Sequence, residues 1–239
     1  MKVLISSFAL GVLLVTGSAA DAQRVSGASP PPGESGTRLG HVGQQDAAAY
    51  GMRFARCLVG FKPREAAAFL STAPGTPASA AAYEALVPQR DNRCIQLGGV
   101  QIGGSTLQMT QRILRGNLAQ ALYLDRFPDS PPATGSAEQT IPVEIYNTRV
   151  TTAADTQSEI IRIFGECMAM RYTAAVDRLV RTDVESDEES AAIGTLAPNM
   201  GPCLWNGQSI QFSRESLRAA LADGLYRWAM GQTGTGSPS

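Results

Sequence analysis

The chain has 239 residues, a formal net charge of −1 and a hydrophobic fraction of 44%. A nucleic-acid-binding surface needs an excess of basic side chains to neutralise phosphates, so this charge balance argues against a nucleic-acid partner. Only Lys2 and Lys62 are lysines among the 20 basic residues, and this preference for arginine favours a GC-rich bacterial source.

The N-terminus has the three parts of a secretory signal peptide. Lys2 supplies a positive charge, residues 3–15 are almost entirely apolar, and Ala20-Asp21-Ala22 forms an A-x-A cleavage site. The apolar run is shorter than the ~20 residues that span a bilayer, which disfavours an uncleaved anchor. We therefore expect residues 1–22 to be removed, no membrane span in the mature chain, and a periplasmic or secreted protein.

Residues 23–44 are rich in serine, glycine and proline and carry few apolar side chains. Such a segment cannot bury enough surface to offset its chain entropy, so we predict that it is disordered. The tail, residues 231–239, has the same composition and the same prediction.

The first folded segment, residues 45–127, has the pattern of four short helices. Apolar side chains recur at helical spacing over about residues 46–60. Pro63 and Pro77 suit the first turns of the second and third helices. Thr110 is suited to be the N-cap of the fourth.

The next segment, residues 128–150, contains a Pro/Ser/Gly stretch and is predicted to be a linker. Within it, residues 141–146 are apolar at alternate positions. This pattern indicates a short strand or an extended segment that lies against the following unit.

The second half of the chain repeats the first. With a shift of 110, an aromatic residue, a cysteine and a proline coincide in the pairs Phe54–Phe164, Cys57–Cys167 and Pro88–Pro198. With a shift of 103, the pattern LRxxLAxxLY at residues 114–123 coincides with residues 217–226. We therefore predict an all-α protein with two tandem pseudo-symmetric units, residues 45–127 and 151–230.

Four cysteines behind a signal peptide indicate disulfides, because exported compartments are oxidising. Four cysteines allow three pairings, and the repeat selects one bridge inside each unit, Cys57–Cys94 and Cys167–Cys203. A bridge that closes a loop of this size stabilises by about 3–4 kcal/mol in the chain-entropy model. That is a large contribution for units this small.

No catalytic, cofactor or metal motif stands out. The only histidine, His41, falls in the segment predicted to be disordered, which argues against triads and histidine-based zinc sites. The glycine-rich run 98–105 resembles a phosphate loop in spacing but has Gly104 at the lysine position. The acidic run 183–189 begins like a calcium loop, yet it lacks the required glycine and the final glutamate and suits a helix start.

Paired carboxylates are the remaining route to hydrolysis without histidine. The acids on predicted helices are Glu65, Glu84, Glu166 and Asp177. Their spacing selects no pair, so we expect surface charges.

Two pairs of residues are candidate ligand contacts. Arg115 and Arg218 occur in both units and could hold an anion at the seam; the alternatives are an exposed arginine or an ion pair. Trp205 and Trp228 occur only in the second unit and form either an aromatic binding surface or part of the core.

These features favour a non-enzymatic exported protein, without a cofactor, that binds an unknown protein or envelope component or acts in envelope maintenance. Two alternatives stay open: a carboxylate-based hydrolase acting on envelope glycan, and a small-molecule binder at the seam between the repeats. A protein partner calls for an exposed apolar patch, a hydrolase for two acids about 5–10 Å apart in one cleft, and a small-molecule binder for an enclosed seam pocket.

Overall fold

Short α-helices make up most of the chain that the computed structural model describes, residues 37–39, 44–87, 93–94, 107–132, 141–205 and 210–234. The first half contains helices α1 (Gln44–Phe61), α2 (Pro63–Ser71), α3 (Pro77–Leu86) and α5 (Gln111–Arg126). The second half contains α6 (Val143–Thr152), α7 (Thr156–Arg171), α8 (Thr173–Arg181), α9 (Asp187–Leu196), two 3₁₀ turns (Ala197–Asn199 and Gly201–Cys203) and α10 (Arg214–Gly234). Two short strands, β1 (Arg38–Leu39) and β2 (Leu107–Gln108), pair antiparallel. The described helices include none that is both long and apolar enough to cross a membrane.

The helix starts follow from local side-chain chemistry. Pro63 and Pro77 occupy first turns, as predicted. The side chains of Thr76, Thr110 and Ser186 each accept the backbone N–H three residues further on. These caps satisfy amide groups that have no partner inside the helix, which is why the sequence signals located the helices well.

The expected strand or extended segment over residues 141–146 is wrong, because most of it belongs to α6. Six residues of alternation are too few to exclude a helix. Pro142 is the N-cap, and Tyr146 and Val150, four residues apart, both pack against the core. Helical spacing of these two apolar side chains therefore decides the conformation.

Two segments predicted to be disordered are partly folded. Thr37 is buried and β1 follows it, so part of residues 23–44 belongs to the fold. Helix α10 also continues to Gly234, into the predicted tail 231–239. The predictions for the signal peptide 1–22 and for the glycine-rich run 98–105 lie outside the described residues.

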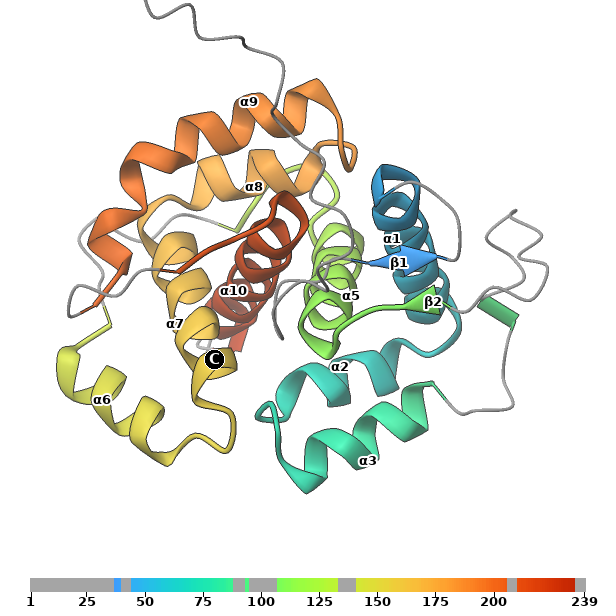
Figure 1. Ribbon diagram of the computed structural model, residues 1–239, viewed down its shortest axis with the longest axis horizontal. Helices are drawn as coiled ribbons and strands as arrows, with labels where there is room; N and C mark the ends of the chain where they lie inside the picture. Colours follow the sequence, from blue (N-terminus) through green and yellow to red (C-terminus); the bar gives the residue numbers. More distant parts are fainter. Residues whose placement is uncertain are drawn as a thin grey trace, which may run out of the picture. The chain divides into compact units, whose positions relative to one another are not determined.

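Helix α10 lies between α5 and α7 (Figure 1) and touches the backbones of both. A Cβ atom built on Gly116 of α5 would lie 2.3 Å from the Cα of Ala219. A Cβ on Gly165 of α7 would lie 2.1 Å from the carbonyl oxygen of Ala220, and one on Gly224 would lie 2.1 Å from the carbonyl carbon of Gly165. These three positions therefore have no room for a side chain.

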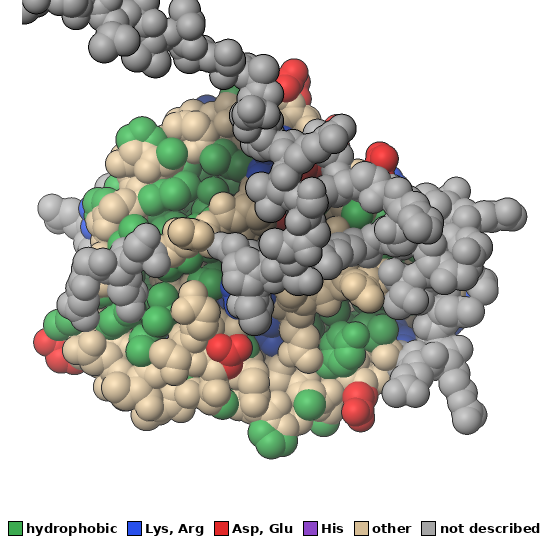
Figure 2. All heavy atoms as spheres, viewed as in Figure 1, with side chains coloured by type: hydrophobic (Ala, Val, Ile, Leu, Met, Phe, Trp, Pro, Cys, Tyr) green, Lys and Arg blue, Asp and Glu red, His purple; other side chains and the backbone are tan. Residues whose placement is uncertain are grey.

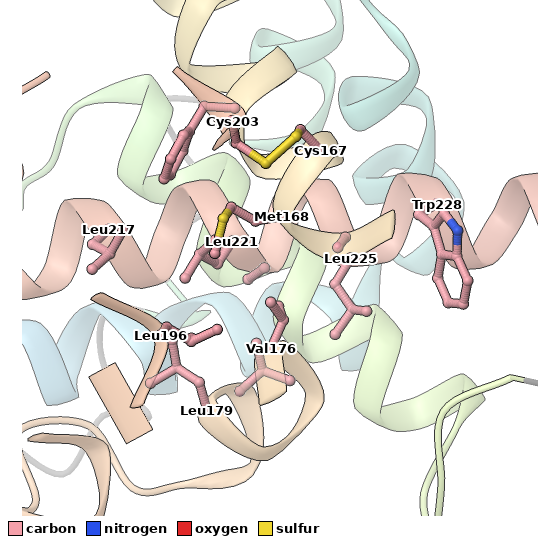
Figure 3. Close-up of a cluster of buried hydrophobic side chains, with 14 of the residues drawn as sticks. Cys167, Met168, Val176, Leu179, Leu196, Cys203, Leu217, Leu221, Leu225 and Trp228 are labelled. Atoms are coloured by element: carbon pink, nitrogen blue, oxygen red, sulfur yellow. A yellow bond between two sulfur atoms is a disulfide. The ribbon is translucent and has the colours of Figure 1, made fainter. Parts of the chain in front are cut away.

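Two hydrophobic clusters form on either side of this helix contact. In the second-half cluster, Leu217, Leu221, Leu225 and Trp228 follow one another along α10 (Figure 3). They meet Val176 and Leu179 of α8, Leu196 of α9 and the Cys167–Cys203 disulfide. The first-half cluster is built from α1, α2, the end of α3 and α5. The described residues belong to one compact unit, so the two predicted repeats are packed together.

The two disulfides, Cys57–Cys94 and Cys167–Cys203, each lie within one half. They span 37 and 36 residues of sequence. The first one ties α1 to chain that follows α3, and the second ties α7 to chain that follows α9. The described residues contain no free cysteine.

The glycine contact predicts a large effect for one methyl group. Gly224→Ala places a Cβ against the backbone of α7, so we expect a loss of at least about 3 kcal/mol in the free energy of unfolding. Gly194→Ala is the matched control in α9, where a Cβ meets nothing within 4 Å. It should stabilise the protein by up to about 1 kcal/mol through helix propensity. Urea denaturation of both variants measures the difference, and similar values for the two would contradict the packing described.

Candidate ligand-binding cavity

Arg115 and Arg218 are both buried, and each binds the C-terminal end of a neighbouring helix. Arg115 donates to the carbonyl oxygens of Phe69, Leu70 and Thr72 at the end of α2, at 3.0, 2.8 and 2.7 Å. Helix C-termini leave carbonyl groups without partners, and an arginine side chain satisfies them. Arg115 thus holds α2 against α5.

Arg218 binds the end of α8 in the same way but has more partners. It donates to the carbonyl oxygen of Thr182 at 2.6 Å and that of Val180 at 3.3 Å. Its Nε donates to the amide oxygen of Gln120, and its Nη1 donates to Glu189, both at 2.9 Å. Every side of this guanidinium group is therefore occupied by protein.

Arg115 lacks two of these partners. In the predicted repeat, Ser79 corresponds to Glu189 and offers no charge to Arg115. In the same alignment Asp223 corresponds to Gln120, and its carboxylate pairs instead with Arg227 at 3.1 Å. As a result the Nε of Arg115 is buried and has no hydrogen-bond partner in the described part of the chain.

A cavity of about 130 Å³ opens beside Arg115, and both halves of the chain line it. The lining residues are Pro74, Gly75, Gln111, Arg112, Arg115, Asp155, Ser158, Ile161, Arg162, Ala219, Ala220 and Asp223. On the face shown in Figure 2, basic side chains are visible in the middle, between the parts formed by α7 and α2, beside an acidic side chain.

Arg112, Arg115 and Arg162 line the cavity, and burial disfavours the charged form of each. Burial lowers the pKa of Arg115 to about 10, with Arg227 and Arg162 adding to the effect and Asp223 opposing it. Burial likewise lowers the pKa of Arg162, helped by Arg227, and that of Arg112, opposed by Asp155. All three stay protonated at neutral pH, so the cavity is lined by incompletely solvated positive charge.

Unused hydrogen-bond donors accompany this charge. The Nε of Arg112 is buried and has no hydrogen-bond partner in the described ranges, like that of Arg115. The Nε of Arg162 lies 3.2 Å from an oxygen of Glu159, an ion pair without hydrogen-bond geometry. A buried donor without a partner is unfavourable, and an acceptor placed in the cavity would satisfy it.

The cavity also holds two carboxylates. Asp155 is the N-cap of α7 and accepts the backbone N–H of Ser158 at 3.0 Å. Burial acts to raise the pKa of Asp155, but the hydrogen bonds from Ser158 and the charge of Arg112 outweigh it and hold the pKa below its usual value. Asp155 is therefore ionised near neutral pH.

A network of ion pairs fixes α6 next to the cavity. Arg149 of α6 donates to Glu159 and Glu166 of α7, both at 2.6 Å. Burial alone would lower the pKa of Arg149, yet its two glutamate partners raise it. This network lines a second, more open cavity of about 410 Å³ that shares Pro74, Asp155 and Arg162 with the first.

A different carboxylate, that of Glu215, binds Thr37. The backbone N–H of Thr37 donates to Glu215 at 2.7 Å, and the Thr37 hydroxyl donates to the other oxygen of the same carboxylate. Burial raises the pKa of Glu215, the bonds from Thr37 oppose the shift, and Glu185 and Glu189 add to it. The side chain of Thr37 also packs over Gly51, where a built Cβ would lie 3.1 Å from the Thr37 hydroxyl oxygen.

The four acids considered above as possible catalytic carboxylates have different surroundings in the structure. Glu65 and Glu84 are exposed. Glu166 pairs with Arg149, and Asp177 accepts the hydroxyl of Tyr123 at 2.7 Å. These four acids are therefore surface charges or partners in ion pairs and hydrogen bonds within the protein.

Glu189 of the acidic run 183–189 and the two tryptophans take part in contacts within the protein. Glu189, at the start of α9, is buried against Arg218. Trp205 stacks on Tyr146 at 4.9 Å between ring centres, and Trp228 belongs to the second-half core. His41 is outside the described residues, and within them no group of three or more potential metal ligands occurs.

Sequence reasoning identified Arg115 but missed Arg112, Arg162, Asp155 and Ser158. The signal that could have revealed one of them is a reversal of charge between the halves. In the predicted repeat, Arg112 corresponds to Glu215, within a stretch where some of the nearby apolar residues match and others do not. The change of charge sign at position 112 is the departure from the repeat pattern that could have been noticed.

A search of family models, of curated proteins and of solved structures finds no match to this chain.

Replacing Arg218 by lysine tests the role of its guanidinium group. Arg218→Lys keeps the charge but cannot reach α8, Gln120 and Glu189 together, so we expect a loss of about 2–4 kcal/mol in the free energy of unfolding. Arg214→Lys is the control, since Arg214 is more exposed and pairs with Glu185 at 3.2 Å. It should cost less than about 1 kcal/mol. Equal effects in urea denaturation would show that the buried contacts of Arg218 are unimportant.

The raised pKa of Glu215 predicts a pH dependence. The folded protein holds the Glu215 proton more tightly than the unfolded chain, so Glu215 stabilises the fold most at low pH. This contribution declines as pH rises above 4.5, the ordinary value, and through the raised folded pKa. The free energy of unfolding of the wild type minus that of Glu215→Gln should fall over this range. A difference that rises with pH would mean that the pKa is lowered.

Proposed function

We propose that this chain is an exported, non-enzymatic protein that binds a small molecule in the cavity at the seam between its two halves. The observation that carries the proposal is the cavity beside Arg115, which is lined by both halves and by buried arginine Nε atoms that have no hydrogen-bond partner within the described residues. Pockets with apolar walls and a few convergent polar groups are the usual form of small-molecule sites.

The proposal includes an origin by duplication of an ancestral helical unit. Helices α2 and α8 have 9 residues each, and α3 and α9 have 10 each. Arg115 and Arg218 bind carbonyl groups that are themselves equivalent, in the pairs Leu70–Val180 and Thr72–Thr182. Positive φ angles also recur at equivalent positions, 77° at Gly75 and 64° at Glu185.

The contact between the halves supports the same origin. Gly116 of α5 meets Ala219 of α10, its own equivalent in the second half, so matching positions face each other as on a two-fold axis. Tyr123 of α5 lies in the second-half core, and its counterpart Tyr226 of α10 packs against both cores, including that of the first half. A site at this seam is then built by both copies.

Export through a signal peptide at residues 1–22 is part of the proposal. It is supported by the sequence of the N-terminus and by the two disulfides, which form and persist in oxidising compartments. A periplasmic or secreted protein of this kind meets small molecules outside the cytoplasm.

The other candidate functions have weaker support. The exposed large hydrophobic residues in the described ranges are Phe61 on α1 and Val143 and Ile145 on α6. Two of the three share α6 and the third lies on α1, and they do not favour a protein partner over a small molecule. A glycan hydrolase needs a carboxylic acid that carries a proton. The lowered pKa of Asp155 makes this residue a poor proton donor, and Asp223 is paired with Arg227.

Filling the cavity tests the proposal. Ser158→Phe adds a ring at the cavity wall while keeping the backbone N–H that caps α7. Gln157→Phe adds the same ring to the exposed neighbouring position, which does not line the cavity. Thermal unfolding is measured for the oxidised chain from residue 23 onward, with a panel of small carboxylates, amines, neutral amides and sugars.

At least one class of compound should raise the melting temperature of the wild type and of Gln157→Phe but not that of Ser158→Phe. A ligand at 100 times its Kd stabilises by about 2.7 kcal/mol, which is a shift of several degrees. If every compound has no effect, or acts equally on Ser158→Phe, the cavity is not a binding site.

A further inference from the structure

The predicted repeat implies a second location equivalent to the cavity, and a residue of the chain itself fills that location. Glu215 is the equivalent of Arg112, and Gly51 is the equivalent of Ile161. Both Glu215 and Gly51 contact Thr37, which is only 1% exposed. Thr37 therefore lies where the duplication would place a second copy of the cavity.

The two locations have opposite hydrogen-bonding character. At the filled one, the carboxylate of Glu215 accepts an N–H and an O–H from Thr37. At the open one, Arg112 takes the place of Glu215, and a guanidinium group can only donate. An occupant of the cavity must therefore present acceptors where Thr37 presents donors.

We infer that the cavity binds a terminal carboxylate on a short apolar body, with Arg112 as the residue that recognises it. This inference rests on the proposed function and names its ligand class. The planar carboxylate matches the fork of donors of an arginine, and hydrogen bonds between two charged groups are among the strongest in proteins. Arg115, which is 4% exposed, lines the same cavity and offers its Nε as a second donor.

The charges around the cavity favour a single negative charge on the ligand. Three arginines and two aspartates line it, which leaves one positive charge in excess. The excess is unchanged when the ion-pair partners are added, since Arg149 and Arg227 are matched by Glu159 and Glu166. A dianion such as phosphate would place a second charge beside Asp155 and Asp223.

The size and the walls of the cavity define the rest of the ligand. Its volume, about 130 Å³, is close to that of an engineered cavity of ~150 Å³ that holds benzene, so it admits on the order of six non-hydrogen atoms. Ile161, Ala219 and Ala220 supply an apolar surface for a short aliphatic part. A free short-chain acid and the C-terminal residue of a peptide both have this chemistry.

Calorimetric titration of the oxidised chain with four probes tests the inference. Propionate represents the free acid and N-acetylalanine the C-terminus of a peptide. Propionamide and N-acetylalanine amide are their neutral counterparts. The variants are Arg112→Gln and, as a matched control, Arg126→Gln at the exposed far end of the same helix.

At least one carboxylate should bind the wild type and Arg126→Gln, and its affinity should fall by roughly 30-fold or more in Arg112→Gln. The neutral counterparts should bind at least about tenfold more weakly than the acids. Preference for propionate or for N-acetylalanine identifies the source of the carboxylate. Ligand-free melting temperatures of both variants show whether the fold is intact.

The inference is overturned if an amide binds as well as its acid, or if Arg112→Gln binds the acid as the wild type does. It is also overturned if neither acid binds while amines or sugars protect the wild type and not Ser158→Phe, a result that leaves the proposed function standing. If no compound raises the melting temperature of the wild type without also raising that of Ser158→Phe, both the inference and the proposed function are wrong.

Discussion

The direct backbone contact between α10 and its two neighbours is the constraint on which the rest of the structure depends. Gly116, Gly165 and Gly224 have no room for a Cβ, so the helices approach more closely than side chains would allow. This close approach puts both hydrophobic clusters against the packed pair of helices α5 and α10. It also brings the start of α5 beside the start of α7. The cavity lies where those two starts meet α10.

Two buried arginines hold the outer helices onto this centre. Arg115 of α5 binds carbonyl groups at the end of α2, and Arg218 of α10 binds carbonyl groups at the end of α8. Their surroundings differ, because Gln120 and Glu189 complete the partners of Arg218, while the Nε of Arg115 has no hydrogen-bond partner among the residues that the structure describes. The candidate site thus arises where one half lacks a partner that the other has.

Much of the fold could be predicted from the sequence because its signals are local. Proline at first turns, threonine and serine caps, and the pattern of cysteines indicated the helices and both disulfides. Helix α6 and the burial of Thr37 could not be predicted, since they depend on the core under Tyr146 and on Glu215, which is distant from Thr37 in the chain.

Most residues of the cavity could not be predicted from the sequence for a similar reason. Arg112, Asp155 and Arg162 look like ordinary charges on helix surfaces, and only the crossing of α10 brings them together. Arg115 could be singled out because it recurs as Arg218, yet its main contact, with helix carbonyls, was not expected. Positions at which the two predicted repeats differ, such as Arg112 and Glu215, therefore indicate the site better than positions at which they agree.

Native-state hydrogen exchange of the oxidised chain tests most directly whether the two halves form one body around α10. We expect the most protected amides of α1, α5, α7 and α10 to exchange only by global unfolding, with one common opening free energy. If one half exchanged as a separate unit at a much lower free energy, the shared helix contact would not be the basis of the structure.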